Sequence, residues 1–290
     1  MKNYIKLLAL LILTSCSTTK QLKTGSQISK DGMLVAQKGI DTYTLLQQQK
    51  DIDRSQQDMI LILTAPNPAA VHFSDSTGNT IAIQIAPRIN AYKSLIAAYQ
   101  AFGRLTGNDN SADTKTAADA LTASYNSVKQ LPDLSSGVMS LISTGGTYIM
   151  QAIQSGSMKK HNEALSQLTK IYLDLWNSEA PTWDRYIDFV YDTYGRQLRT
   201  IPAKNYDMTK VKAGVADQPY TGDAISLALY QEKQYVTVIQ QKNTLKKQLA
   251  DFGKLLTLLN QAHIEFSKDQ ADTTAAASTL INIETLLQTK

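Results

Sequence analysis

A heptad pattern of apolar residues near the C-terminal end restricts the fold more than any other feature of the chain. The pattern covers residues 245–266, where its members recur at alternating steps of four and three residues. Its members are Leu245, Leu249, Phe252, Leu256, Leu259, His263 and Phe266. This spacing aligns the side chains along one seam of a helix, as in long antiparallel bundles and coiled coils. The pattern therefore predicts a long helix packed against other long helices.

Apolar residues at helical spacing recur along most of the rest of the chain. Pro87, Asp133 and Asp223 are suited to begin helices, and Pro181 predicts a new cap or a kink. The expected helices cover residues 31–60, 87–107, 112–130, 134–158 and 159–200, a long helix after Asp223, and a short one over 272–288. Residues 201–222 hold two prolines and two glycines and predict a long loop. Together these features predict an all-α protein, an elongated antiparallel bundle of long helices.

Residues 61–87 depart from the helical pattern. Pro66 and Pro68 interrupt the preceding helix. The apolar alternation over residues 80–85 has the period of a strand, and a turn-like segment separates it from residues 71–73. A small β-hairpin near 70–86 and an irregular loop between helices are equally compatible with this sequence.

The N-terminus has the three parts of a secretory signal: a basic start, an apolar run over residues 7–13, and small residues at 14–15. The apolar run is too short to span a bilayer. Leu13-Thr14-Ser15-Cys16 resembles the lipobox of bacterial lipoproteins, and Cys16 is the only cysteine of the chain. The resemblance implies thioether lipidation of Cys16, removal of residues 1–15, and further acylation of the new amino group.

The lipobox resemblance sets the expected organisation and location. A lipidated, flexible, polar tether is expected over residues 16–30, followed by a helical domain over 31–290. Several acyl chains together give stable anchoring. Ser17 stands where aspartate favours inner-membrane retention in the enterobacterial sorting rule, so the resemblance implies the outer membrane. The expected partners are the membrane, through the lipid, and another envelope protein.

Composition argues against nucleic acid as a partner. The 29 basic residues nearly balance the 25 acidic ones, and they form no long basic block. Lipidation of Cys16 would leave no thiol for a disulfide, so stability is expected to come from helix packing. No cofactor-binding motif occurs, and no cofactor is expected.

Few residues suggest catalysis or metal binding. The three histidines, His72, His161 and His263, lie far apart in sequence and form no zinc motif. An aspartate stripe at steps of four residues is a weak metal-site candidate, because carboxylates are ligands for divalent cations. It consists of Asp184, Asp188 and Asp192. A solvated helix face is the favoured interpretation of this stripe.

Aromatic residues are dense over 176–194 and are candidates for a ligand or partner surface. The candidates are Trp176, Trp183, Tyr186, Tyr191 and Tyr194, with Phe189 among them in sequence. Their spacing covers both faces of a helix, so part of the set is expected in the core.

Residues 134–158 contain no charged residue. The favoured interpretation is a central helix buried on all sides by its neighbours. The alternative is a membrane-inserting segment: a helical bundle with an uncharged head and a small β-tongue resembles cytolysin-type pore-forming toxins, with 61–87 and 134–158 as the matching elements.

Three functions follow as expectations. The first is a non-enzymatic, lipid-anchored envelope protein that acts as a helical interaction or structural module. The second is a membrane-active protein of the cytolysin type. The third is a ligand-binding protein or enzyme that uses the aromatic and aspartate residues of 176–194.

Overall fold

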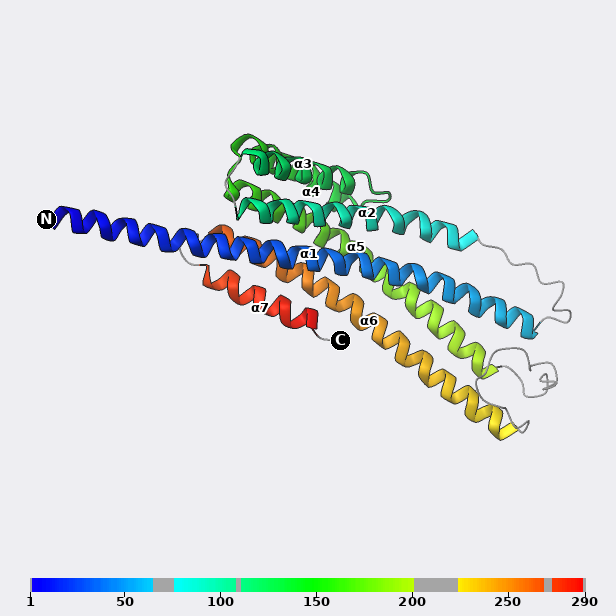
Figure 1. Cartoon of the computed structure of the whole chain (residues 1–290). Coiled ribbons are helices and arrows are strands. Elements are labelled where there is room, and N and C mark those ends of the chain that lie inside the picture. Colours follow the sequence, from blue (N-terminus) through cyan, green and yellow to red (C-terminus); the bar gives the residue numbers. More distant parts are fainter. Residues whose placement is uncertain (1, 65–75, 108–110, 201–223, 269–272, 289–290) are drawn as a thin grey trace. The chain divides into compact units, whose positions relative to one another are not determined.

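The computed structural model of the chain describes residues 2–64, 76–107, 111–200, 224–268 and 273–288. Seven helices account for nearly all of these residues (Figure 1). They are α1 (Lys2–Thr64), α2 (Ser76–Leu105), α3 (Ser111–Lys129), α4 (Ser136–Ser155), α5 (Met158–Thr200), α6 (Ala224–Lys268) and α7 (Thr274–Gln288). The predicted all-α fold is therefore confirmed.

The helices contribute to two compact units. Unit 1 contains Met1–Leu45, Ala82–Glu179 and Ala250–Lys290, and unit 2 contains Leu46–Ile81 and Ala180–Leu249. Helices α1, α2, α5 and α6 each supply residues to both units, and the domain predicted over 31–290 comprises parts of both.

Both alternatives for residues 70–86, a small β-hairpin and an irregular loop, are wrong for the part of this segment that the structure describes. Residues 76–86 belong to α2, and residues 70–75 lie outside the described ranges. Pro87, expected at the start of a helix, lies inside α2. The Arg88 guanidinium donates to the carbonyl of Gln84 at 2.7 Å, close to where the proline removes a backbone donor.

Other helix boundaries differ in detail from the expectations. Ser135, not Asp133, caps α4, and its hydroxyl accepts from the backbone N–H of Val138. Asp133 instead adopts a left-handed conformation with φ 57° in the preceding turn. Pro181 neither ends nor restarts α5, which continues from Met158 to Thr200. Asp223, Asp272 and the loop predicted over 201–222 lie outside the described residues.

Close packing between α1 and α2 organises the core of unit 1. Gly32 lies against the ring of Tyr99, and Gly39 lies against the ring of Tyr92. The two glycines are seven residues apart, as are the two tyrosines, and they pair in reverse order, so the helices run antiparallel. The Ser29 hydroxyl donates to the Tyr99 carbonyl at 2.6 Å on the same interface. Glycine is required here because a β-carbon would meet the rings.

Large aromatic side chains fill the centre of unit 1. The ring of Trp176 meets those of Tyr43 and Phe252 edge-on, with centroids 6.0 and 4.8 Å apart. The rings of Tyr92 and Tyr172 contact each other at a tilt of 53°, with centroids 4.8 Å apart. Every member of the predicted heptad seam is buried, so that prediction is confirmed.

The structure places residues 16–30 in a helix, in place of the flexible tether that the sequence predicted there. Residues 16–30 lie within α1, and Thr24 and Ile28 are buried in unit 1. A β-carbon on Gly25 would lie 2.8 Å from Thr106, the residue that follows α2, so this turn of α1 already packs closely. The polar composition that suggested a tether instead belongs to a helix with one narrow buried face.

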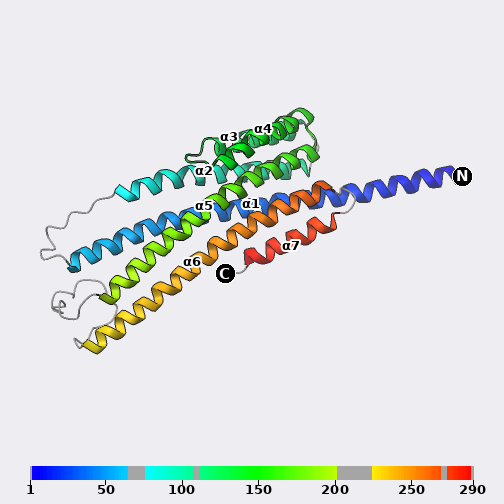
Figure 2. The ribbon, with the colours of Figure 1, turned by 180° about the vertical axis from the view of Figure 1, so that it is seen from behind.

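Helix α4 is not buried on all sides, so the favoured interpretation of residues 134–158 is also wrong. One face is buried, and it consists of Val138, Ile142, Gly145, Ile149 and Ala152. On the opposite side Met139 and Met150 are each 54% exposed. Helices α3 and α4 lie side by side in both views (Figures 1 and 2), and the Tyr125 hydroxyl of α3 donates to the Ile142 carbonyl at 2.8 Å. Among the described residues, no helix combines the length and apolar character needed to cross a bilayer.

Candidate binding groove and other predicted sites

The aspartate stripe of α5 forms a ladder of ion pairs with α6 in unit 2. Lys242 bridges Asp188 and Asp192 at 2.8 and 2.7 Å, and Lys246 bridges Asp184 and Asp188 at 3.0 and 2.9 Å. Hydrogen bonds from the two lysines lower the pKa of Asp188. Ammonium groups therefore lie where a divalent cation would have to bind. Within the described ranges, no three His, Cys, Asp or Glu side chains gather to form a metal site.

The structure separates the aromatic candidates of α5 into different environments. Trp176, Trp183 and Tyr191 are buried, and the Tyr191 hydroxyl donates to Gln49 at 2.6 Å. Tyr186 and Tyr194 are partly buried. Phe189, which the sequence placed among them, is the most exposed at 61%. The five candidates therefore form no continuous exposed surface. Three of them, Trp176, Trp183 and Tyr191, pack in the core of one unit or the other.

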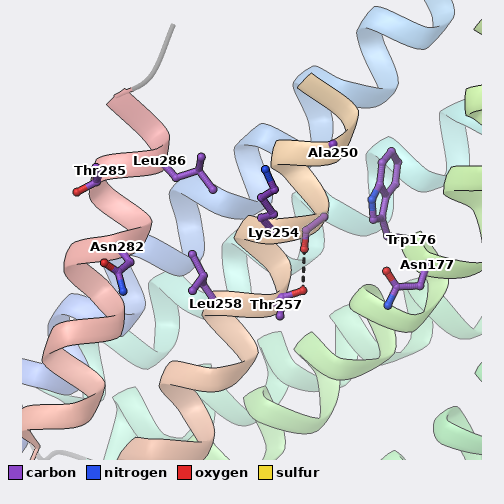
Figure 3. Close-up of a pocket in the computed structure, with 10 residues that line it drawn as sticks. Trp176, Asn177, Ala250, Lys254, Thr257, Leu258, Asn282, Thr285 and Leu286 are labelled. Carbon is purple, nitrogen blue, oxygen red and sulfur yellow. Dashed lines mark hydrogen bonds between the residues drawn. The ribbon is translucent and has the colours of Figure 1, made fainter. Parts of the chain in front are cut away.

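One groove in unit 1 contains a predicted residue, Trp176. The groove has a volume of about 690 Å³ and crosses the outer face of α6. Figure 3 shows Trp176 and Asn177 of α5 on one side of α6, and Asn282, Thr285 and Leu286 of α7 on the other. The floor and rim from α6 consist of Ala250, Gly253, Lys254, Thr257 and Leu258. Pockets of this size hold small organic ligands.

Gly253 has no side chain, so the indole edge of Trp176 lies close to the backbone of α6 at this position. A β-carbon at position 253 would lie 2.9 Å from the indole nitrogen Nε1 and 3.2 Å from Cδ1. The nitrogen faces α6 in Figure 3. The Trp176 residue is only 2% exposed, yet it lines the groove, and its N–H has no acceptor among the described residues. A hydrogen-bond donor is thus presented to the groove at the one place where α6 lacks a side chain.

Lys254 is the only charged residue among the described residues that line the groove. Its ammonium lies 3.2 Å from Asp251 on the same helix, and its side chain is 66% exposed. Such an exposed pair holds the side chain only weakly. Within the described residues, the lining therefore combines apolar surface, the indole donor, amide and hydroxyl groups and one cation, without a carboxylate.

A buried polar network in unit 1 accounts for His263, which the sequence placed on the heptad seam. Its Nδ1 lies 2.7 Å from the side-chain oxygen of Asn162, which can only accept, so Nδ1 carries the proton. Its Nε2 therefore accepts from the Tyr99 hydroxyl at 2.8 Å. Burial lowers the pKa of His263 to about 3. The imidazole is neutral and joins α2, α5 and α6 as a structural residue.

His161 has a structural environment as well. His161 is buried near the start of α5, and its Nδ1 lies 3.0 Å from the Ser157 carbonyl. Burial lowers the pKa of His161. His72 and the side chain of Cys16 lie outside the described residues.

A buried ion pair links α2 and α5 in unit 1. Arg88 is 2.6 Å from Glu179 at its closest, and the Tyr43 hydroxyl of α1 donates to the other oxygen of Glu179 at 2.7 Å. The Arg88 side chain is 3% exposed and that of Glu179 13%. The remaining donors of Arg88 reach the carbonyls of Gln84 and Pro132, so protein groups occupy both members of the pair and the arrangement is structural.

The sequence identified Trp176 but not the other residues of the groove. They come from three helices and share no motif. The only sequence signal is Gly253, which lies beside the seam residue Phe252 in an otherwise favourable helical segment. The chain matches no protein-family model, no curated protein and no solved structure.

Proposed function

We propose that this protein is a lipid-anchored envelope lipoprotein that acts as a non-enzymatic interaction module. The observation that carries the proposal is that α1 contains both the lipobox cysteine and core residues of unit 1. Cys16 precedes Gly25, the first closely packed glycine, by nine residues, which is about 14 Å of helix. An acyl chain on Cys16 would hold unit 1 at a short, defined distance from the membrane.

Anchoring favours an interaction role. A protein confined to a thin layer reaches a high effective concentration for partners in the same layer. The exposed face of α4 supports this role because it carries no charge, and Met139 and Met150 lie on it. Uncharged helix faces of this kind are suited to contact another protein, and an envelope protein is the proposed partner class.

Metabolic labelling with an alkyne fatty acid tests the anchor. The wild-type chain should incorporate the label and fractionate with membranes, and Cys16→Ser should do neither. Ser15→Thr serves as a neighbouring control and should retain labelling. Equal labelling of the wild type and Cys16→Ser would overturn the lipid anchor.

Crosslinking in intact cells tests the interaction role. A single envelope protein should crosslink to the wild type and be lost with Cys16→Ser. It should also be lost when Met139 and Met150 are both replaced by Glu, with membrane attachment retained. Recovery of the same protein from both variants would contradict the proposed interaction.

A further inference from the structure

We propose that the groove across α6 is a binding site for an amphiphilic anion, a molecule with an apolar body and an anionic oxygen group. The proposal concerns unit 1 alone and does not depend on lipidation. The N–H of Trp176 would donate to a ligand oxygen, and Lys254 would supply the positive charge. The apolar body would lie on the surface formed by the α6 and α7 residues.

The unpaired indole N–H is the first argument. Trp176 is almost completely buried, and its ring is fixed between Tyr43 and Phe252. Almost all buried polar groups in proteins have a hydrogen-bond partner. The Trp176 N–H has no protein acceptor among the described residues, and it is not one of the fully enclosed polar atoms, so an oxygen of solvent or of a ligand in the groove can accept from it.

The absence of a side chain at position 253 is the second argument. Glycine in the middle of a helix costs about 1 kcal/mol relative to alanine. Gly253 lies inside a helix of 45 residues, and any other residue there would place its β-carbon against Nε1. Gly253 therefore keeps the donor accessible.

The charge of the lining is the third argument, and it selects the ligand class. Among the described residues that line the groove, Lys254 is the only charged one, and it is also paired with Asp251 of the same helix at 3.2 Å. Leu258 and Leu286 supply apolar surface across the groove. An ammonium and an N–H donor both favour an oxygen anion. A cationic amphiphile of the same length would meet the same apolar surface but would be repelled by Lys254.

The groove also has space for such a molecule. Its volume is about 690 Å³, and it is an open surface groove in which one side of a ligand would stay in contact with solvent. Asn177 and Asn282 stand on opposite sides of it (Figure 3) and offer further donors to a ligand that crosses α6. A medium-chain carboxylate combines an apolar body with an anionic acceptor.

The test follows the indole N–H signals in a two-dimensional ¹H–¹⁵N spectrum of the full chain carrying Cys16→Ser. The chain has two tryptophans, so Trp183→Phe assigns the signal of Trp176. Sodium decanoate, below its micelle concentration, is the probe, and decyltrimethylammonium is its cationic control. Decanoate should shift the Trp176 signal saturably, and the cation should bind at least about tenfold more weakly.

Two variants locate the effect. Gly253→Ala should weaken decanoate binding at least about tenfold by covering Nε1, and Lys254→Ala should remove the preference for the anion. Lys247→Ala, an exposed lysine of α6 outside the groove, should bind as the wild type does. Unchanged helical circular dichroism of each variant shows that it is folded.

Three outcomes would overturn the proposal. They are the lack of a saturable shift with decanoate, equal binding of the cationic probe, and undiminished binding by folded Gly253→Ala. The last outcome would place the probe elsewhere on the protein, as an adventitious additive only.

Discussion

At the scale of a residue, one added β-carbon tests the contact between α1 and α2. In Gly32→Ala the new methyl group would overlap the ring of Tyr99, which Thr169 and His263 hold in place by hydrogen bonds. We expect a loss of about 1–3 kcal/mol in the free energy of unfolding, as for other overpacked cores. Urea denaturation measures this loss. Gly137→Ala is the matched control, since a β-carbon there meets only Ser135 at 4.0 Å, and it should not destabilise the protein.

Two buried titratable residues give unit 1 opposite responses to acid. Burial raises the pKa of Asp31 from 3.8 to about 6, so between these values the folded chain keeps a proton that the unfolded chain loses. The stability contributed by Asp31 therefore falls as the pH rises through this window. Burial lowers the pKa of His263 from 6.5 to about 3, so the unfolded chain gains a proton first. The stability contributed by His263 falls as the pH drops through its window.

Replacing Asp31 by Asn removes the first response and leaves the second. We expect Asp31→Asn to be more stable than the wild type at neutral pH, because no buried carboxylate has to ionise. The advantage should shrink by about 1.4 kcal/mol per pH unit as the pH falls from 6 toward 4. Urea titrations across this range measure the difference. Asp41→Asn, at an exposed position of α1, is the control, and an Asp31→Asn effect of equal size at every pH would refute the argument.

At the scale of an element, ion pairs of different burial hold the helices together. Glu179→Gln leaves the buried Arg88 without a counter-charge, so we expect a loss of about 3–5 kcal/mol. Asp188→Asn removes two of the four ion pairs of the α5–α6 ladder, where the Asp188 side chain is 36% exposed, and should cost less than about 1 kcal/mol. Urea denaturation compares the two. Equal losses would show that burial does not set the strength of these pairs.

The same ion pairs between α5 and α6 predict how the stability of the protein responds to divalent cations. Lys242 and Lys246 already neutralise the carboxylates of Asp184, Asp188 and Asp192. Millimolar calcium or magnesium should therefore leave the thermal unfolding midpoint unchanged in the wild type. A cation-dependent rise that disappears in Asp188→Asn would restore the aspartate stripe as a metal site.

The elements differ in how well the sequence predicted them, for physical reasons. The heptad seam of α6 repeats over many turns, and a long pattern of this kind has few alternative folds. The alternation over residues 80–85 is short, so it fits a helix as well: Ile85 is buried in α2 while Ile83 is 67% exposed. Aromatic residues on both faces of α5 could not be sorted from sequence, because sorting depends on which face meets its neighbours.

At the scale of the whole molecule, the sequence predicted the all-α class because helical periodicity covers most of the chain. The groove could not be predicted, since α5, α6 and α7 form it only after packing. The uncharged stretch of α4 was misjudged for a related reason. Lack of charge suggested complete burial, but Ser, Thr and Gln face solvent there without charge.

The N-terminal turns of α1 give the last test, because a tether and a packed helix differ in what their removal does. Ile28 is fully buried, and Ser29 hydrogen-bonds to Tyr99. Deleting residues 16–30 from the chain that begins at residue 16 should therefore cost at least about 3 kcal/mol, in the range for losing large core side chains. Deleting only residues 16–18 should cost almost nothing. Urea denaturation of the two truncated chains and the parent, with Cys16→Ser, measures both. Equal stability of all three chains would mean that residues 16–30 are a dispensable tether. In that case the anchor would not hold unit 1 at a short, defined distance from the membrane.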